Sequence, residues 1–237
     1  MGQLRLLFTH LAQGMARSAL DLKTLSIVLL AVVSLATAAA LTGCRAATSQ
    51  PLQPVALLLA FDTSGSFEPE LESSFNAAGT VGAMVDPRND DLRVFSFDTF
   101  PREVLSDPNL AVSQFNVRLY RELKVTEELG TNFVAILERL DRAAGQSGDK
   151  PAVVVIFTDG APDGPLEQQG EAIDQALARL ASNPKVSKVF LLGVKPRFRE
   201  QWRDRAEEFY DKVFVGDIDQ VTLTRETVST LRTGARE

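Results

Sequence analysis

Three short segments of the sequence carry side-chain oxygens in patterns that could hold a metal ion. They are Asp62-Thr63-Ser64-Gly65-Ser66, Gly130-Thr131-Asn132 and Thr158-Asp159-Gly160. The first and third segments each follow a short apolar run of the kind that forms a buried strand. Hydroxyl and carboxylate oxygens are the ligands that hard divalent cations prefer. If the three segments meet in the fold, they predict a site for such a cation.

The rest of the composition excludes several other kinds of chemistry. The only histidine is His10 and the only cysteine is Cys44, so the body of the chain cannot form a Ser-His-Asp or Cys-His arrangement. A zinc site of thiolates and imidazoles is excluded for the same reason. No Gly-rich P-loop is present, and we expect no ATPase activity. The formal net charge of −6 disfavours non-specific binding to nucleic acid.

Strand and helix patterns alternate between residues 55 and 232. Apolar runs and alternating patterns predict strands at 55–61, 91–97, 102–105, 153–157, 186–194 and 213–215. Helical patterns cover 67–85, a segment from 133 to about 145, one that ends near Pro184, 198–210 and 221–231, while 109–126 is expected to be part helix and part loop.

This alternation predicts a three-layer, doubly wound α/β domain with a mostly parallel sheet and one antiparallel edge strand. The domain is expected to cover 55–232, with a tail at 233–237. Ligands of such sheets bind at the carboxyl ends of the strands, where the topology switches. The three oxygen-rich segments are all expected at that edge.

Together the three segments resemble the metal-ion-dependent adhesion site of von Willebrand factor A (vWA) domains. The match is an Asp-x-Ser-x-Ser element, then a Thr, then an Asp, and the resemblance covers about residues 54–232. It implies the following site residues: Asp62, Ser64, Ser66, Thr131 and Asp159. The hydroxyls would contact the cation, and the two carboxylates would mainly accept hydrogen bonds from bound water and from the serines. Mg²⁺ is the expected cation, with Mn²⁺ or Ca²⁺ as substitutes. A protein partner would add an Asp or Glu carboxylate.

Each segment also has a simpler interpretation when it is taken alone. Ser66 is a suitable N-cap for the helix at 67–85, Thr131 suits an N-cap, and Thr-Asp-Gly at 158–160 suits a turn. Their order along the chain and their places at strand ends favour the metal site.

Four further features of the sequence are expected to have structural rather than ligand-binding roles. Asp163 is expected in a turn rather than as a ligand, and the acidic stretch 86–91 as a solvated turn rather than a second ion site. Trp202 is expected to pack its helix rather than to recognise a partner. The basic stretch 195–205 is expected to be a solvated helix face, with contact to lipid head groups or a partner as the alternative.

The N-terminal segment has the pattern of an export signal. Residues 25–41 contain no charge and follow Arg17 and Lys23. The segment ends in Leu-Thr-Gly-Cys44, which resembles the bacterial lipobox. This implies removal of 1–43 as a signal peptide, lipidation of Cys44, a tether at 44–54, and a location on the exported side of the inner or outer membrane. An uncleaved membrane anchor and a plain signal are the alternatives, and translation could begin at Met15.

These observations favour a non-enzymatic module that binds a protein through a divalent cation on the membrane surface. One alternative is a metal-assisted phosphohydrolase on a similar scaffold. No His or Lys base is expected beside the three segments, and an Asp-x-Ser replaces the Asp-x-Asp nucleophile of one such class, which argues against it. Another alternative is a structural envelope lipoprotein whose site is inactive.

Overall fold

The computed structural model describes residues 52–106, 112–125, 130–162 and 166–234. The predicted signal segment, Cys44 and Asp163 lie outside these ranges. The strands are β1 (Ala56–Asp62), β2 (Asp91–Phe97), β3 (Arg102–Leu105), β4 (Ala152–Phe157), β5 (Val186–Leu192) and β6 (Val213–Gly216). The helices are α3 (Glu68–Gly82), α4 (Val112–Glu122), α5 (Phe133–Gly145), α6 (Leu166–Ser182), α7 (Pro196–Arg205) and α8 (Val221–Thr233), and two 3-10 turns are η1 (Glu207–Phe209) and η2 (Ile218–Gln220). Within the described ranges, no helix has the length and apolar character needed to span a bilayer.

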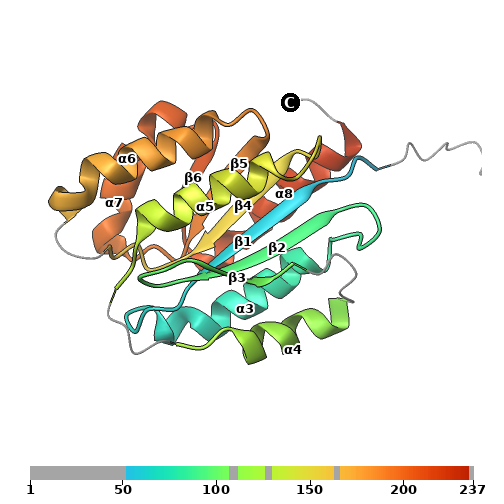
Figure 1. The fold of residues 1–237 in the computed structure, drawn as a ribbon, viewed down its shortest axis with the longest axis horizontal. Coiled ribbons are helices and arrows are strands. Elements are labelled where there is room, and N and C mark those ends of the chain that lie inside the picture. The colour runs from blue at the N-terminus through green and yellow to red at the C-terminus, as the bar shows by residue number, and fades with distance from the viewer. Residues whose placement is uncertain (1–51, 107–111, 126–129, 163–165, 235–237) are drawn as a thin grey trace, which may run out of the picture. The chain divides into compact units, whose positions relative to one another are not determined.

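The six strands form one sheet in the order β3-β2-β1-β4-β5-β6 (Figure 1). β1 pairs in parallel with both β2 and β4, and β3 is the antiparallel edge strand on β2. This confirms the predicted fold class. The chain moves from β1 to one side through β2 and then to the other side through β4, β5 and β6. The topology therefore switches between β1 and β4, at their carboxyl ends.

The sheet is covered by helices on both faces, which explains the unbroken apolar runs. All seven residues of β1 are buried, and the six apolar ones alternate between two apolar layers. Leu57 and Phe61 pack in the layer that contains α3, α4 and α8, whereas Leu58 and Ala60 pack in the layer that contains α5, α6 and α7. Figure 1 shows α3 and α4 on one side of the sheet and α5, α6 and α7 on the other. A strand buried on both faces shows no polar alternation in its sequence.

Three predicted helix ends differ from the structure. Helix α3 begins after Phe67, without a side-chain cap, so Ser66 is not its N-cap. Helix α5 is capped by Asn132, whose Oδ1 accepts a hydrogen bond of 3.0 Å from the backbone N–H of Ala135. Thr131 is therefore not a cap either. Helix α7 ends at Arg205 and a 3-10 turn follows, whereas the periodicity predicted one helix to 210.

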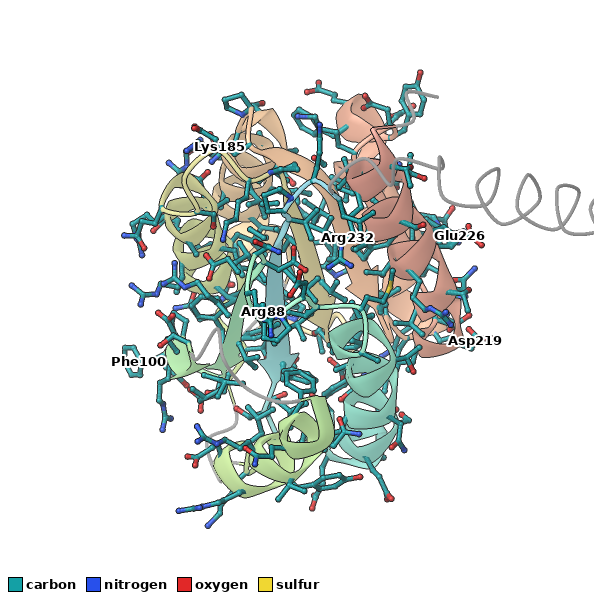
Figure 2. All side chains as sticks on the ribbon, turned by 90° about the vertical axis from the view of Figure 1, so that its right-hand side faces the viewer. Arg88, Phe100, Lys185, Asp219, Glu226 and Arg232 are labelled. Atoms are coloured by element: carbon teal, nitrogen blue, oxygen red, sulfur yellow. The ribbon has the colours of Figure 1, made fainter. Side chains whose placement is uncertain are left out.

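The acidic turn before β2 is partly buried, contrary to the prediction of a solvated turn. Asp90 is only 4% exposed, and its carboxylate accepts hydrogen bonds from the backbone N–H groups of Val55 at 2.9 Å and Asp86 at 2.7 Å. Arg232 of α8 also pairs with it. Figure 2 labels Arg232 and looks onto the end of the domain where β1 begins. Asp90 thus ties the start of β1, the turn and the last helix together.

The basic stretch 195–205 is not a uniformly solvated face. Arg199 pairs with Asp217, and Arg205 pairs with Asp174. These partners are exposed carboxylates on neighbouring elements, so the pairs contribute little stability individually. The guanidinium groups of Arg199 and Arg205 are nevertheless paired within the domain, whereas the sequence predicted that they face solvent, lipid head groups or a partner.

Candidate functional site

The first and third oxygen-rich segments are in direct contact at the switch point. Asp62 is the last residue of β1, and Thr158 and Asp159 follow β4, whose Phe157 lies opposite Phe61. Thr158 Oγ1 donates a hydrogen bond of 2.8 Å to Asp62 Oδ2. Both carboxyl-bearing residues, Asp62 and Asp159, are fully buried. The edge lies at the lower left of Figure 1, where the arrow of β1 ends.

The loop after β1 brings its two serine hydroxyls together. The backbone N–H of Ser64 donates to Asp62 Oδ1 at 3.0 Å, which folds the loop back over the strand end. Ser64 Oγ then lies 3.2 Å from Ser66 Oγ. Ser64 is buried, whereas Ser66 is exposed, so the pair extends from the interior to the surface.

Thr131 lies at the same edge but is less directly connected. The backbone N–H of Asn132 donates at 2.8 Å to the carbonyl oxygen of Asp98, which directly follows β2. Because Phe97 is paired with Asp62 across the sheet, this bond holds the Thr131 loop beside the end of β1. Thr131 is 3% exposed. In the parts of the chain that the structure describes, no hydrogen bond joins the Thr131 side chain to the other four predicted site residues.

Lys195, the first residue of the basic stretch 195–205, also lies at the candidate site although its sequence pattern did not place it there. Lys195 Nζ donates to Asp159 Oδ2 and to the carbonyl oxygen of Ser66, both at 2.9 Å. The expectation that no lysine stands beside the three segments is therefore wrong. Lys195 follows β5 and is 36 residues from Asp159, but β5 is the neighbour of β4. Its place just after the predicted strand 186–194 was the one signal that could have found it.

Thr158 is a second residue of the candidate site to which the sequence pattern gave no role. Its hydroxyl donates to Asp62 and accepts a hydrogen bond of 3.1 Å from the backbone N–H of Gly160. Thr158 thereby fixes the direction of one Asp62 oxygen. Nothing in the Thr-Asp-Gly pattern distinguished this role from that of an ordinary turn residue.

Burial changes the acidity of Asp62. Desolvation raises the pKa of its carboxyl from 3.8 to about 6. Hydrogen bonds from Ser64 and Thr158 act in the opposite direction, and the negative charge of Asp159 adds to the increase. The ionised form of Asp62 is thus disfavoured by its surroundings, and a nearby cation would favour it.

Gly160 and Trp202 support the loop after β4. Gly160 has φ of +80°, and a Cβ there would lie 2.8 Å from Val194 Cγ1 and 3.0 Å from Trp202 Nε1. Trp202 is fully buried and donates a hydrogen bond of 3.0 Å to the carbonyl oxygen of Gly160. This confirms that Trp202 packs its helix, and it also shows that α7 holds the loop that carries Asp159.

The donor set fits a hard divalent cation. Two hydroxyls, with carboxylates beside them, suit Mg²⁺ better than a soft metal. Adjacent ligands of an octahedral Mg²⁺ at 2.0–2.1 Å lie about 3 Å apart, close to the 3.2 Å between the serine hydroxyls. Among the residues described, no cluster of three or more His, Cys, Asp or Glu side chains is suited to a metal.

The chain matches no protein-family model and no curated protein. Its fold is similar to several solved structures. A von Willebrand factor type A protein from Catenulispora acidiphila has a TM-score of 0.57 at 14% identity, with 78% of this chain and 44% of that chain covered. BatB from Bacteroides thetaiotaomicron, a conserved hypothetical protein, has a TM-score of 0.55 at 15% identity, with 75% and 98% covered. The pilus adhesin SpaC from Lactobacillus rhamnosus GG has a TM-score of 0.57 at 12% identity, with 77% and 30% covered.

This chain spans about half or less of the length of several matched proteins. At these identities the likeness concerns the fold alone. The fold, a mostly parallel sheet with an antiparallel edge strand and helices on both faces, is similar to that of the von Willebrand factor type A protein.

Proposed function

We propose that this chain is a membrane-anchored module that binds a protein partner through a divalent cation. The observation that carries the proposal is the 3.2 Å separation of Ser64 Oγ and Ser66 Oγ at the switch point of the sheet. The same edge holds the buried carboxylates of Asp62 and Asp159. Mg²⁺ is the proposed cation, and Mn²⁺ or Ca²⁺ could replace it.

The five residues would divide into two groups around the cation. Ser64, Ser66 and Thr131 would supply hydroxyl oxygens, and Asp62 and Asp159 would accept hydrogen bonds from bound water and from the serines. A cation held mainly by neutral hydroxyls keeps much of its positive field and attracts a carboxylate from outside. The partner would therefore present an Asp or Glu side chain.

The rim of the site offers an apolar contact for such a partner. Phe100 is 66% exposed, and its backbone N–H donates at 2.9 Å to Oδ1 of the buried Asp98. Figure 2 shows Phe100 projecting outward from the domain. Aromatic side chains near the centre of an interface often contribute much of its affinity. The fold of the pilus adhesin SpaC is similar, and it supports adhesion or assembly as the proposed role.

Metal-dependent binding of a protein partner can be tested with the full chain immobilised in detergent. Membrane extracts would be passed over it with Mg²⁺ and with a chelator. A protein retained only with Mg²⁺, and released by soluble aspartate-containing peptide, supports the proposal. Retention that is equal under both conditions contradicts a metal-mediated contact.

Replacing Ser64 with alanine is expected to weaken Mg²⁺ binding by at least about tenfold, because one of the cation's hydroxyl ligands is lost. Isothermal titration calorimetry of the full chain in detergent measures this. Ser73→Ala is the matched control, since Ser73 Oγ bonds only within α3, to the carbonyl oxygen of Glu70. Equal Mg²⁺ affinity of the Ser64 variant and the wild type would remove Ser64 from the proposed ligand set.

The proposed anchor is a lipid on Cys44, on the exported side of the inner or outer membrane. Cys44→Ser is expected to abolish incorporation of a clickable palmitate, because the thiolate is the nucleophile in lipidation. Labelling of growing cells measures this, with Ser49→Ala in the same tether as the control. Label that persists in the Cys44 variant would show that the chain is not anchored through this residue.

The phosphohydrolase alternative gains no base from Lys195. Lys195 Nζ is in an ion pair with Asp159 Oδ2, and an ammonium group carries no lone pair that could accept a proton. Hydrolysis of p-nitrophenyl phosphate that requires Mg²⁺ and Asp62 would nevertheless favour that alternative. Absence of Mg²⁺ uptake would favour the structural lipoprotein with an inactive site.

A further inference from the structure

The ammonium group of Lys195 lies beside two of the segments that form the candidate metal site. It links the loop after β4 to the loop after β1, because it donates to Asp159 Oδ2 and to the Ser66 carbonyl oxygen at 2.9 Å each. These loops also carry most of the proposed metal-binding residues. Lys195 is thus positioned to affect any cation bound there.

The backbone of Lys195 is fixed by a hydrogen bond to Asp159 and by the start of α7. Its backbone N–H donates at 2.9 Å to the carbonyl oxygen of Asp159, so the two residues are joined through both backbone and side chain. Pro196 begins α7 directly afterwards and restricts the backbone at this point. The side chain of Lys195 is 30% exposed, whereas that of Asp159 is fully buried. The ammonium therefore has a route to solvent, and the carboxylate does not.

Asp159 has one oxygen that is not already used by its own loop. The backbone N–H of Ala161 donates to Asp159 Oδ1 at 2.9 Å, and Lys195 takes Oδ2. A buried carboxylate requires a compensating charge or hydrogen bonds. Lys195 supplies this charge without a metal, and a divalent cation with its bound water would supply it instead.

We infer that Lys195 is a built-in cation that competes with the divalent cation for Asp159. The two positive charges repel each other at close range, so uptake of the metal requires the ammonium to leave Asp159 for the solvent-exposed rim. There it faces an arriving partner and would attract the same class of acidic side chain. Lys195 thereby lowers the metal affinity of the free protein and couples metal uptake to partner binding. This inference rests on the proposed metal site.

The test measures binding of Mg²⁺ and Mn²⁺ to the full chain in detergent by isothermal titration calorimetry. Lys195→Met removes the charge at similar length and is expected to tighten binding by at least about tenfold. Lys195→Arg keeps the charge and is expected to bind like the wild type. Lys188→Met is the matched control, because Lys188 Nζ bonds to the Asp211 carbonyl oxygen away from the site.

Thermal melts accompany the titrations, because Lys195→Met leaves Asp159 without its partner. The variant is expected to melt lower than the wild type in chelator and to gain more from added Mg²⁺. Lys195→Gln serves as the second uncharged variant, since its amide can still donate to Asp159. A purely structural role of Lys195 would lower the melting temperature without raising metal affinity.

The outcomes separate this inference from the proposed function. Tighter binding by both uncharged variants, or uptake by them and none by the wild type, supports competition. Equal or weaker binding by Lys195→Met and Lys195→Gln, with normal uptake by the wild type, overturns the inference and leaves the metal site standing. No uptake by any of these folded proteins overturns the metal site itself.

Discussion

Replacing Asp62 with asparagine is expected to weaken Mg²⁺ binding by about 10- to 100-fold and, at the same time, to stabilise the metal-free fold. Burial raises the pKa of Asp62 from 3.8 to about 6, so its ionised form costs the folded state about 3 kcal/mol above pH 6. Asparagine carries no charge, and its side-chain oxygen can still accept the hydrogen bond from the Ser64 N–H. Its NH₂ group would replace Oδ2 and donate to Thr158 Oγ1, which reverses the present hydrogen bond. The expected gain is about 2–3 kcal/mol in the free energy of unfolding at neutral pH.

The pH dependence of the wild type follows from the same shift. Between pH 3.8 and about 6 the folded state holds a proton on Asp62 that the unfolded state has released. The contribution of Asp62 to stability is therefore fully present below pH 3.8 and is lost as the pH rises through about 6. Asp62→Asn removes this contribution to the pH profile.

Urea unfolding in chelator at pH 5 and pH 7.5, together with Mg²⁺ titration, measures these effects. Asp149→Asn is the matched control, because Asp149 is an exposed carboxylate before β4. A variant that binds Mg²⁺ as the wild type does would exclude Asp62 from the site. A less stable Asp62→Asn protein would show instead that the ionised carboxylate stabilises the metal-free fold.

Truncation of Trp202 to alanine is expected to destabilise the domain by about 3–5 kcal/mol, and more if the neighbouring groups do not relax. Trp202 is fully buried, and its ring contacts that of Phe133 edge-on, with centroids 4.7 Å apart. The change removes this contact and leaves the Gly160 carbonyl oxygen without its hydrogen bond of 3.0 Å. Urea unfolding monitored by circular dichroism measures the loss.

Trp202→Phe separates the two contributions. The phenyl ring keeps most of the packing, and only the hydrogen bond to Gly160 is lost, so the expected cost is about 1–3 kcal/mol. Because Gly160 follows Asp159, this variant is also expected to bind Mg²⁺ more weakly through a looser loop. Equal stability of the phenylalanine and alanine variants would show that the indole N–H, rather than the ring, accounts for the effect.

The mostly parallel class of the sheet could be predicted because its central strands are buried on both faces and are therefore apolar throughout. The unbroken apolar runs of β1 and β4 indicated strands covered on both faces, and the helices between them required parallel crossovers. Those two features place the ends of β1 and β4 at one edge. The contact between Asp62 and Thr158 is a direct consequence of that placement.

The helix caps and the buried acidic turn could not be predicted in the same way. Ser66, Thr131 and Asn132 all suit an N-cap by residue type, and the local backbone decided that only Asn132 serves as one. In the sequence, Asp90 is an ordinary acidic turn residue. Its ion-pair partner, Arg232, lies 142 residues further along the chain. Residue type alone does not reveal a partner so far along the chain.

The sequence by itself determined the fold class and placed the oxygen-rich segments at strand ends, because hydrophobic periodicity is a local property of the chain. Only the tertiary structure decided the charge balance of the site. Lys195 reaches Asp159 because β5 lies beside β4, and the pKa of Asp62 rises because helices and strands exclude water from it. Electrostatic interactions and desolvation depend on distances through space, and those distances exist only once the chain has folded.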